Sequence, residues 1–263
     1  MQNAKLFKDR LRQGPVCLGT CISFTDATVT EALCGLLDFV WIDMEHNALS
    51  LETVQGHVMA TKGSQTAPLV RVPWNDPVLI KPVLDIGAAG VIVPLIRTAD
   101  DVRRAVAACL YPPAGIRGFG PRRPSNYGRL SGPEYCKAAN DGMIVIVQIE
   151  HVDAVANIDE ILSVSGLTSV VIGPNDLAGS LGHMGEPNHP KVHEAIEKVL
   201  GRARSKGFPV GIATGAKPPG LVDWVTKGMR WLAMGNDVSL LLQSATQTVE
   251  QVSGHHAARA AKK

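Results

Sequence analysis

The chain has 263 residues, 45% of them hydrophobic, and its 26 Lys and Arg residues against 24 Asp and Glu residues leave a net charge of +2. This is enough for the core of one domain over residues 1–263, a size that (β/α) barrels commonly reach. A near-neutral chain without a basic, aromatic-rich stripe argues against a nucleic-acid partner. No signal-like or membrane-spanning apolar segment is visible, so we expect a cytoplasmic protein with no membrane partner.

Short apolar runs alternate with helical patterns from one end of the chain to the other. We expect strands over residues 16–23, 39–45, 68–72, 90–96, 143–150, 169–173, 209–213 and 231–234. We expect helices over residues 27–37, 51–62, 77–86, 99–109, 152–164, 192–206, 221–227 and 239–255. Doubly wound open sheets share this alternation, but a count of eight β-then-α units favours an α/β fold with a closed parallel (β/α)8 TIM barrel.

Two segments fall outside this pattern. Residues 111–133 are rich in Pro, Gly and Arg, and an irregular stretch of that length is usually functional or mobile. Its polar side chains, which either are solvated or meet anionic substrate groups, are Arg117, Arg122, Arg123 and Tyr127. Residues 257–263 have the composition of a frayed tail.

Two carboxylates stand at the ends of consecutive predicted strands, where (β/α) barrels carry their chemistry. Glu150 closes the apolar run 143–150, and Asp176 comes shortly after the next strand. An acid at the end of a buried strand is costly without a positive partner, so this pair indicates a divalent metal held by oxygen ligands. Helix caps or salt-bridge partners are the alternative interpretation of these two residues.

Other polar residues follow the same strand ends. Gln148 lies two residues before Glu150 and therefore shares its face of the strand. Asp43 and Arg71 end the second and third strands, where a purely structural ion pair is the alternative to a role in a site. Several remaining polar residues are expected to be structural or exposed: Asp85, His183, His189 and His193.

Six short motifs occur in order along the chain. They are Ile42-Asp-Met-Glu-His46, Arg71-Val-Pro, Leu84-Asp-Ile-Gly-Ala-Ala-Gly-Val-Ile-Val-Pro94, Tyr111-Pro-Pro-Ala-Gly-Ile-Arg-Gly118, Gln148-Ile-Glu150 and Gly173-Pro-Asn-Asp-Leu177. Any one of them is weak, but together they resemble the HpcH/HpaI aldolases over roughly residues 5–250. The resemblance implies a class II, metal-dependent, pyruvate-utilising aldolase on a (β/α)8 barrel.

The resemblance also implies roles for particular residues. Glu150 and Asp176 match the metal ligands, for Mg²⁺ or Mn²⁺ with Co²⁺ or Zn²⁺ as alternatives. Arg71 and Gln148 match residues that contact the 2-oxo acid. His46 matches the acid–base histidine, with Asp43 as its partner.

A turn after the sixth strand matches the segment whose backbone amides meet the substrate carboxylate. Its residues are Gly173, Pro174, Asn175 and Asp176. Asn175 departs from the Ala that the family often has there, a change that a main-chain contact tolerates. Asn47-Ala48 also replaces the Gly or Ala followed by Pro of many relatives, which bears on substrate choice.

The residues and the resemblance point to the same chemistry. A metal-chelated 2-oxo acid loses a proton or an aldol bond more readily, because the metal stabilises the enolate. We therefore expect reversible cleavage of a 4-hydroxy-2-oxo acid to pyruvate and an aldehyde. A CoA-ester lyase or a decarboxylating enzyme with the same core, and a non-catalytic barrel scaffold, are the alternatives. The resemblance further implies a homo-hexamer, a dimer of trimers that exchanges its last helix between subunits.

Overall fold

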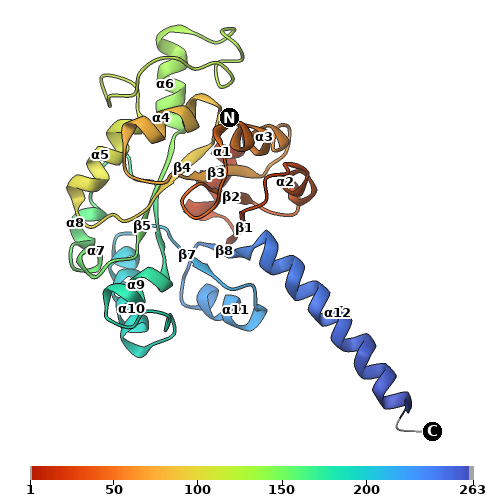
Figure 1. Cartoon of the computed structure of the whole chain (residues 1–263). Coiled ribbons are helices and arrows are strands. Elements are labelled where there is room, and N and C mark those ends of the chain that lie inside the picture. Colours follow the sequence, from red (N-terminus) through yellow and green to blue (C-terminus); the bar gives the residue numbers. More distant parts are fainter. Residues whose placement is uncertain (1, 261–263) are drawn as a thin grey trace.

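The computed structural model describes residues 2–260 and consists of a closed barrel of eight parallel strands surrounded by helices (Figure 1). Each strand pairs with the next one along the chain, and the eighth pairs with the first. The strands are β1 (Cys17–Ile22), β2 (Phe39–Asp43), β3 (Ala67–Arg71), β4 (Gly90–Val93), β5 (Ile144–Ile149), β6 (Ser169–Ile172), β7 (Val210–Thr214) and β8 (Trp231–Asn236). The predicted TIM barrel is confirmed.

Most helices coincide with the expected ones. The helices are α1 (Gln2–Gln13), α2 (Thr28–Leu33), α3 (Leu51–Ala60), α4 (Pro77–Asp85), α5 (Ala99–Cys109), α6 (Gly132–Gly142), α7 (Val152–Ala156), α8 (Ile158–Ile161), α9 (Pro174–Ser180), α10 (Pro190–Ser205), α11 (Pro218–Thr226) and α12 (Asp237–Ala260). The helix expected over residues 152–164 is divided into α7 and α8 at Asn157, whose ψ of 12° leaves the helical range. The helices α1, α6 and α9 were not predicted.

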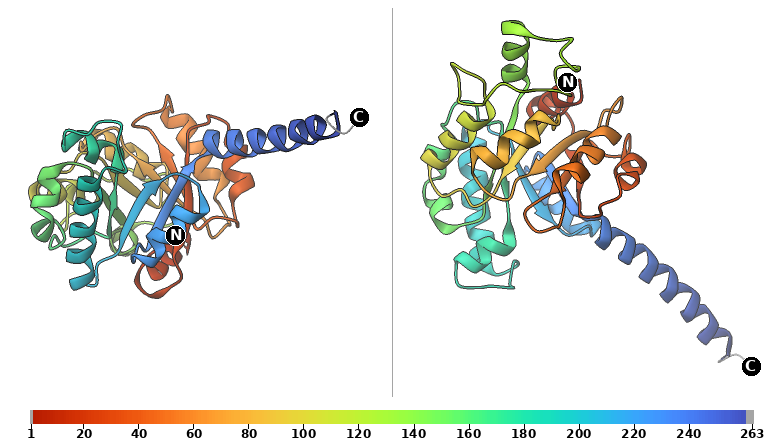
Figure 2. Two further views of the ribbon diagram at one scale, coloured as in Figure 1. Left: turned by 90° about the horizontal axis from the view of Figure 1, so that it is seen from below. Right: turned by 45° about the horizontal axis from the view of Figure 1, so that its top comes forward.

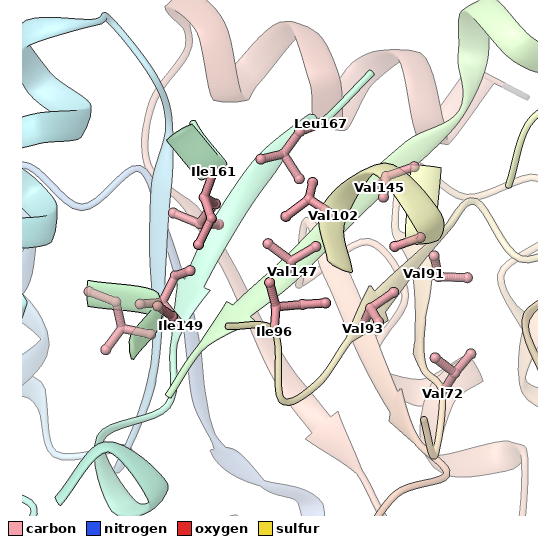
Figure 3. Packing of buried hydrophobic residues seen from close by; sticks show 14 of the residues in the cluster. Val72, Val91, Val93, Ile96, Val102, Val145, Val147, Ile149, Ile161 and Leu167 are labelled. Atoms are coloured by element: carbon pink, nitrogen blue, oxygen red, sulfur yellow. The ribbon is translucent and has the colours of Figure 1, made fainter. Parts of the chain in front are cut away.

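Alternate residues of each strand pack on opposite sides of the barrel wall. In β5, Ile144 and Ile146 belong to the cluster that fills the barrel, whereas Val145 and Val147 pack outward against the helices (Figure 3). This two-residue period carries on to the end of the strand, so Gln148 continues the inward series. The hydrophobic pattern of the strand thus determines which polar side chain enters the barrel at its carboxyl end.

An aromatic cluster fills the amino-terminal half of the barrel interior. The ring centroids of Phe39 and Trp231 are 5.3 Å apart, and Phe7 of α1 lies 5.5 Å from Phe39 and closes the amino-terminal end. Glycine is required at position 211 for the Trp231 ring to fit, because a Cβ there would lie 2.2 Å from the ring. The amino-terminal half of the barrel interior is therefore closely packed with large apolar side chains.

The irregular segment from residue 111 and the following α6 lie at the amino-terminal end of the barrel, because they connect α5 to the start of β5 (Figure 1). Arg117 is buried there, with its guanidinium 2.8 Å from the Asp85 carboxylate and 4.5 Å above the Tyr111 ring. Asp85 is structural, as expected, and Arg117 is not a solvated side chain. Within this subunit the segment lies away from the carboxyl ends of the strands.

The last helix, α12, extends away from the barrel in every view (Figures 1 and 2). Its first residue, Asp237, is buried and accepts hydrogen bonds from the backbone N–H groups of Ser23 and Phe24, both at 2.9 Å. The helix is assigned as far as Ala260, residues 261–263 lie outside the described part of the chain, and the frayed tail expected over residues 257–263 stays a prediction. Across residues 2–260, no helix combines the length and hydrophobicity needed to cross a membrane.

A buried histidine joins α3 to two neighbouring segments. His57 Nδ1 lies 2.8 Å from the Thr30 hydroxyl, and Nε2 lies 3.0 Å from the Phe24 carbonyl oxygen. Burial lowers the pKa of His57, although the Phe24 carbonyl and Asp237 act in the opposite direction. The His57 imidazole therefore binds a proton more tightly in the unfolded chain than in the folded protein. The free energy of unfolding should fall as the pH drops below about 6.5, the ordinary pKa of histidine.

We predict that His57→Gln will flatten the pH dependence of stability. At about pH 7.5 the variant should lose on the order of 1 kcal/mol for its altered hydrogen bonds. Towards about pH 5.5 the wild type should lose stability faster than the variant, so that the two melting temperatures converge. Thermal unfolding across this range measures both curves, and parallel curves would contradict the assignment.

Candidate active site

Polar side chains from three strands meet at the carboxyl end of the barrel. Asp43 ends β2, Arg71 ends β3 opposite it in register, and Gln148 lies near the end of β5 with Glu150 just beyond. None of the four is more than 9% exposed. Charged groups at this depth require partners, because an unpaired buried charge is strongly destabilising.

Arg71 is held from several sides. Its Nε and Nη2 donate to the two carboxylate oxygens of Asp43 at 2.8 and 2.7 Å, a bidentate pair. Its Nη1 lies 2.9 Å from Glu45 Oε2 and donates to Gln148 Oε1 at 3.3 Å. The guanidinium also lies 5.1 Å from the centre of the Trp41 ring. The ion pair weighed as a structural alternative thus exists, and it is part of a larger network.

The network continues from Gln148 to Glu150. Gln148 Nε2 donates to Glu150 Oε2 at 2.6 Å, and the backbone N–H of Leu95 donates to Glu150 Oε1 at 2.6 Å. Leu95 follows β4 and has a φ of +56°, an unusual value for a residue with a side chain. Residues at the ends of β4 and β5 therefore fix the position of this carboxylate.

The site holds more acids than its one guanidinium can neutralise. Burial above all raises the pKa of Glu150 to about 7, and the nearby carboxylates Glu45 and Asp176 act in the same direction. Burial also raises the pKa of Glu45, against the opposing effect of Arg71. Ionised acids crowded together in this way are stabilised by an added cation.

The residues fit a divalent metal. Gly173 makes room for the Glu150 carboxylate, since a Cβ there would lie 2.8 Å from Oε2. The chain then enters α9, whose first turn carries the exposed Asp176. Carboxylate oxygens are the ligands that Mg²⁺ and Mn²⁺ prefer, so Glu150 and Asp176 are the side chains that could hold one.

The turn between β6 and α9 also leaves backbone donors available. The N–H of Gly173 donates to the Ile149 carbonyl at 3.3 Å, and Pro174 has no N–H. The amides of Asn175 and Asp176 are in the first turn of the helix, where N–H groups have no partner within the helix. Of the four residues expected to contact a substrate carboxylate, these two carry the N–H groups suited to it.

His46 is placed differently from the expectation. Its side chain is 60% exposed, and its Nε2 lies 3.7 Å from Glu45 Oε2. The structure does not bring the side chains of Asp43 and His46 into contact, because the Asp43 oxygens are engaged by Arg71 and by Asn47 Nδ2 at 2.7 Å. Asp43 reaches His46 only through the backbone N–H, at 3.5 Å.

Glu45 was the residue that sequence reasoning missed. It lies two positions past the end of β2 and contacts both Arg71 and His46. Its place in the motif Ile42-Asp-Met-Glu-His46 was the available signal. An acidic residue between a histidine and a buried arginine joins the solvent-exposed part of the site to the buried network.

Comparison with known proteins identifies the family. The model of the HpcH/HpaI aldolase/citrate lyase family matches residues 22–243. A 4-hydroxy-2-oxo-heptane-1,7-dioate aldolase of Salmonella paratyphi C is 40% identical over 248 residues, covering 93% of this chain and 92% of the relative. The chain therefore belongs to the HpcH/HpaI aldolase/citrate lyase family, and the resemblance seen in its motifs is confirmed.

Solved structures agree with this assignment. The crystal structure of a family member from Burkholderia cenocepacia J2315 superposes with a TM-score of 0.88 at 33% identity, covering 94% of this chain and 98% of that one. The citrate synthase SbnG superposes with a TM-score of 0.83 at 27% identity, covering 95% and 98% of the two chains. The same barrel thus carries proteins named for different carbon–carbon bond chemistry.

We predict a large loss of stability when one partner of the buried pair of Arg71 and Asp43 is removed. Arg71→Met leaves Asp43 buried and unpaired, so the free energy of unfolding should fall by about 3–5 kcal/mol. Replacing Asp43 as well, in Asp43→Leu/Arg71→Met, should recover part of that loss because the orphaned charge is gone. Urea unfolding provides the measurement.

A matched control is available on α5. Arg103 pairs with Asp100 at the surface, so Arg103→Met should cost less than about 1 kcal/mol. A loss in Arg71→Met no larger than that of Arg103→Met would show that the buried pair does not support the fold.

Proposed function

We propose that the chain is a metal-dependent aldolase that reversibly cleaves a 4-hydroxy-2-oxo acid to pyruvate and an aldehyde. The observation that carries this proposal is the buried network that links Arg71, Gln148 and Glu150 beside an excess of acids. It provides one fixed positive group and a carboxylate site for a cation, the two features that an enolate-forming reaction requires. The aldolases among the relatives support the same assignment.

Each residue of the site is assigned to one part of the substrate. A divalent cation held by Glu150 and Asp176 would supply Lewis-acid polarisation of the substrate carbonyl. The amides of Asn175 and Asp176 bind the substrate carboxylate, and Gln148 lies between the cation site and Arg71. Arg71, already held by Asp43, stabilises negative charge on the ketone oxygen without having to reorganise.

His46 is proposed to transfer the proton. Glu45 lies beside Nε2, which leaves Nδ1 to take the proton from the 4-hydroxyl group of the substrate. The bond between C3 and C4 then breaks, its electrons pass to the pyruvyl part as an enolate, and the aldehyde leaves. One proton is then delivered to C3 to complete pyruvate and replaces the one that His46 took from the 4-hydroxyl group, so that no other reactant is consumed.

The oxygen ligands favour Mg²⁺ or Mn²⁺, with Co²⁺ or Zn²⁺ as alternatives. A CoA-ester lyase or a decarboxylating enzyme would use the same cation and enolate chemistry on another substrate. A non-catalytic scaffold would have no use for several buried charges at a strand end, because each of them costs stability. The proposal includes a cytoplasmic location and small molecules as the only substrates.

The proposed function is tested by exchange of the pyruvate methyl protons in D2O, which needs the cation and the enolate but no aldehyde. We predict exchange in the presence of Mg²⁺ or Mn²⁺, its loss after chelation with EDTA, and its return when the metal is added back. Glu150→Gln should lose activity by about 10²-fold or more, and proton NMR of pyruvate measures the rate.

The surface variant Glu194→Gln, on α10, serves as the control and should match the wild type. Exchange that persists after exhaustive chelation, or in Glu150→Gln, would exclude the metal-dependent mechanism. Cleavage assays with 4-hydroxy-2-oxo acids, coupled to lactate dehydrogenase, then separate an aldolase from the other enzymes that form an enolate.

We also propose that α12 packs against another subunit in a homo-hexamer, a dimer of trimers. Four of its apolar side chains are more than half exposed on the isolated chain: Leu241 60%, Leu242 59%, Val249 63% and Val252 57%. An exposed apolar series on a projecting helix is costly in water, and exchange of a terminal element is a low-cost route to closed assemblies.

We predict that light scattering will report a hexamer, and that Leu241→Glu/Val249→Glu will dissociate it by placing charge in the contact. Gln243→Glu/Gln247→Glu adds the same charge at polar positions of the helix and should dissociate it less. A wild-type monomer at micromolar concentration would overturn the proposal.

A further inference from the structure

A second group of metal-ligand side chains lies in the loop between α9 and α10, outside the buried network. The potential ligand atoms of His183, Glu186 and His189 all lie within 4.8 Å of one another. The two histidines are half-buried and Glu186 is exposed. The sequence indicates surface positions for these histidines but does not reveal that they lie together.

The backbone builds this cluster. The N–H of Glu186 donates to the carbonyl of His183 at 3.0 Å, and the N–H of His189 donates to the carbonyl of Glu186 at 2.9 Å. Two successive four-residue turns, 183–186 and 186–189, thus bring the three side chains together. Gly182 and Gly185 both have a φ of +83°, which glycine adopts without strain.

The loop is also attached to the helix before it. The N–H of His183 donates to the Ala178 carbonyl of α9 at 2.8 Å, and Met184 packs where a Cβ on Gly179 would lie 2.4 Å from its Cε. His189 stands at the start of α10, where its Nδ1 accepts the N–H of Lys191 at 3.3 Å. The three side chains therefore bridge two helices.

The two imidazole rings stack with centroids 3.5 Å apart and planes 14° apart. A neutral imidazole has a ring nitrogen that can serve as a metal ligand, and the stack holds two such rings side by side. Parallel rings do not yet converge on one point. Both side chains are partly exposed, and the contact of His189 with Lys191 is long, so metal binding at this site requires the rings to turn from the stacked arrangement.

We propose that His183, Glu186 and His189 form a binding site for a transition-metal ion of borderline softness, with Zn²⁺ as the best match. Two imidazole nitrogens and one carboxylate oxygen are typical Zn²⁺ ligands, and three protein ligands leave a fourth position for water. The carboxylate pair at Glu150 and Asp176 offers only oxygen and prefers harder cations. A bound ion ties α10 to α9, the helix whose first turn carries Asp176.

The experiment measures Zn²⁺ binding directly. His255→Ala/His256→Ala is the background, because this pair is another candidate ligand for Zn²⁺. Saturating Mg²⁺ occupies the carboxylate pair, and Zn²⁺ is titrated in competition with a chromophoric chelator. We expect one equivalent of Zn²⁺ in this background, and the same equivalent in a protein that also carries Glu150→Gln.

Three variants test the ligands one by one. His183→Ala, Glu186→Gln and His189→Asn should each weaken Zn²⁺ binding by at least about tenfold, as even changes outside the ligand shell commonly do. Asn at position 189 keeps a side-chain acceptor for the start of α10, so its effect reports the lost imidazole rather than a lost cap. His193→Ala, which removes the next histidine along α10, should leave binding unchanged.

The readout is independent of the proposed catalysis. Zn²⁺ binding that is weakened in each of the three variants supports the site, even if the protein does not catalyse pyruvate exchange. The site is overturned if the background protein binds no Zn²⁺, or if His183→Ala and His189→Asn bind Zn²⁺ as tightly as the background does. Either result leaves the proposed function untouched.

Discussion

The bidentate pair of Arg71 and Asp43 is the contact on which the site depends. The two residues are partners in the register of β2 and β3, so the barrel itself sets their separation. Two buried charges are expensive to desolvate and stay in place only when their hydrogen bonds are satisfied. Asp43 satisfies the requirement with both oxygens, and the remaining Nη1 of Arg71 then determines the positions of Glu45 and Gln148.

Close packing in the amino-terminal half of the barrel supports the polar network at the carboxyl end. Phe7, Phe39 and Trp231 fill the amino-terminal half of the barrel interior, and the Trp231 indole N–H donates to the Ser169 hydroxyl at 2.8 Å. Because the interior is dense, Arg71 and Gln148 have little room for other rotamers. The polar network is therefore organised before any substrate arrives, as stabilisation of developing charge requires.

The sequence predicted the parts of the molecule that follow from the two-residue period of a strand. It located all eight strands and placed Arg71, Gln148 and Glu150 at the carboxyl ends of their strands. It also placed Gln148 and Glu150 on the same face of β5, because side-chain direction alternates reliably up to the strand end. Beyond that point the chain turns, and the period no longer determines direction. The partner of His46 and the role of Glu45, both past the end of β2, could not be read from spacing.

Other differences have local causes. The first helix carried a helical signal in Ala4, Phe7 and Leu11, the residues that it buries against the barrel floor, but it lies outside the β-then-α repeat. The proximity of His183 and His189 depends on two glycine residues with positive φ, a backbone property that sequence spacing alone does not reveal.

The balance of charge at the carboxyl end of the barrel connects the network to the proposed chemistry. Arg71 is the cation of the buried network, and both oxygens of Asp43 already engage it. Burial is the main cause of the raised pKa values of Glu45 and Glu150, and the neighbouring carboxylates, Asp176 among them, act in the same direction. A site built only for stability would replace such acids with apolar residues, since that exchange is often neutral or favourable. Their arrangement around Gly173, where only glycine leaves space for the Glu150 carboxylate, is better explained by a cation that compensates the cost and takes part in the reaction.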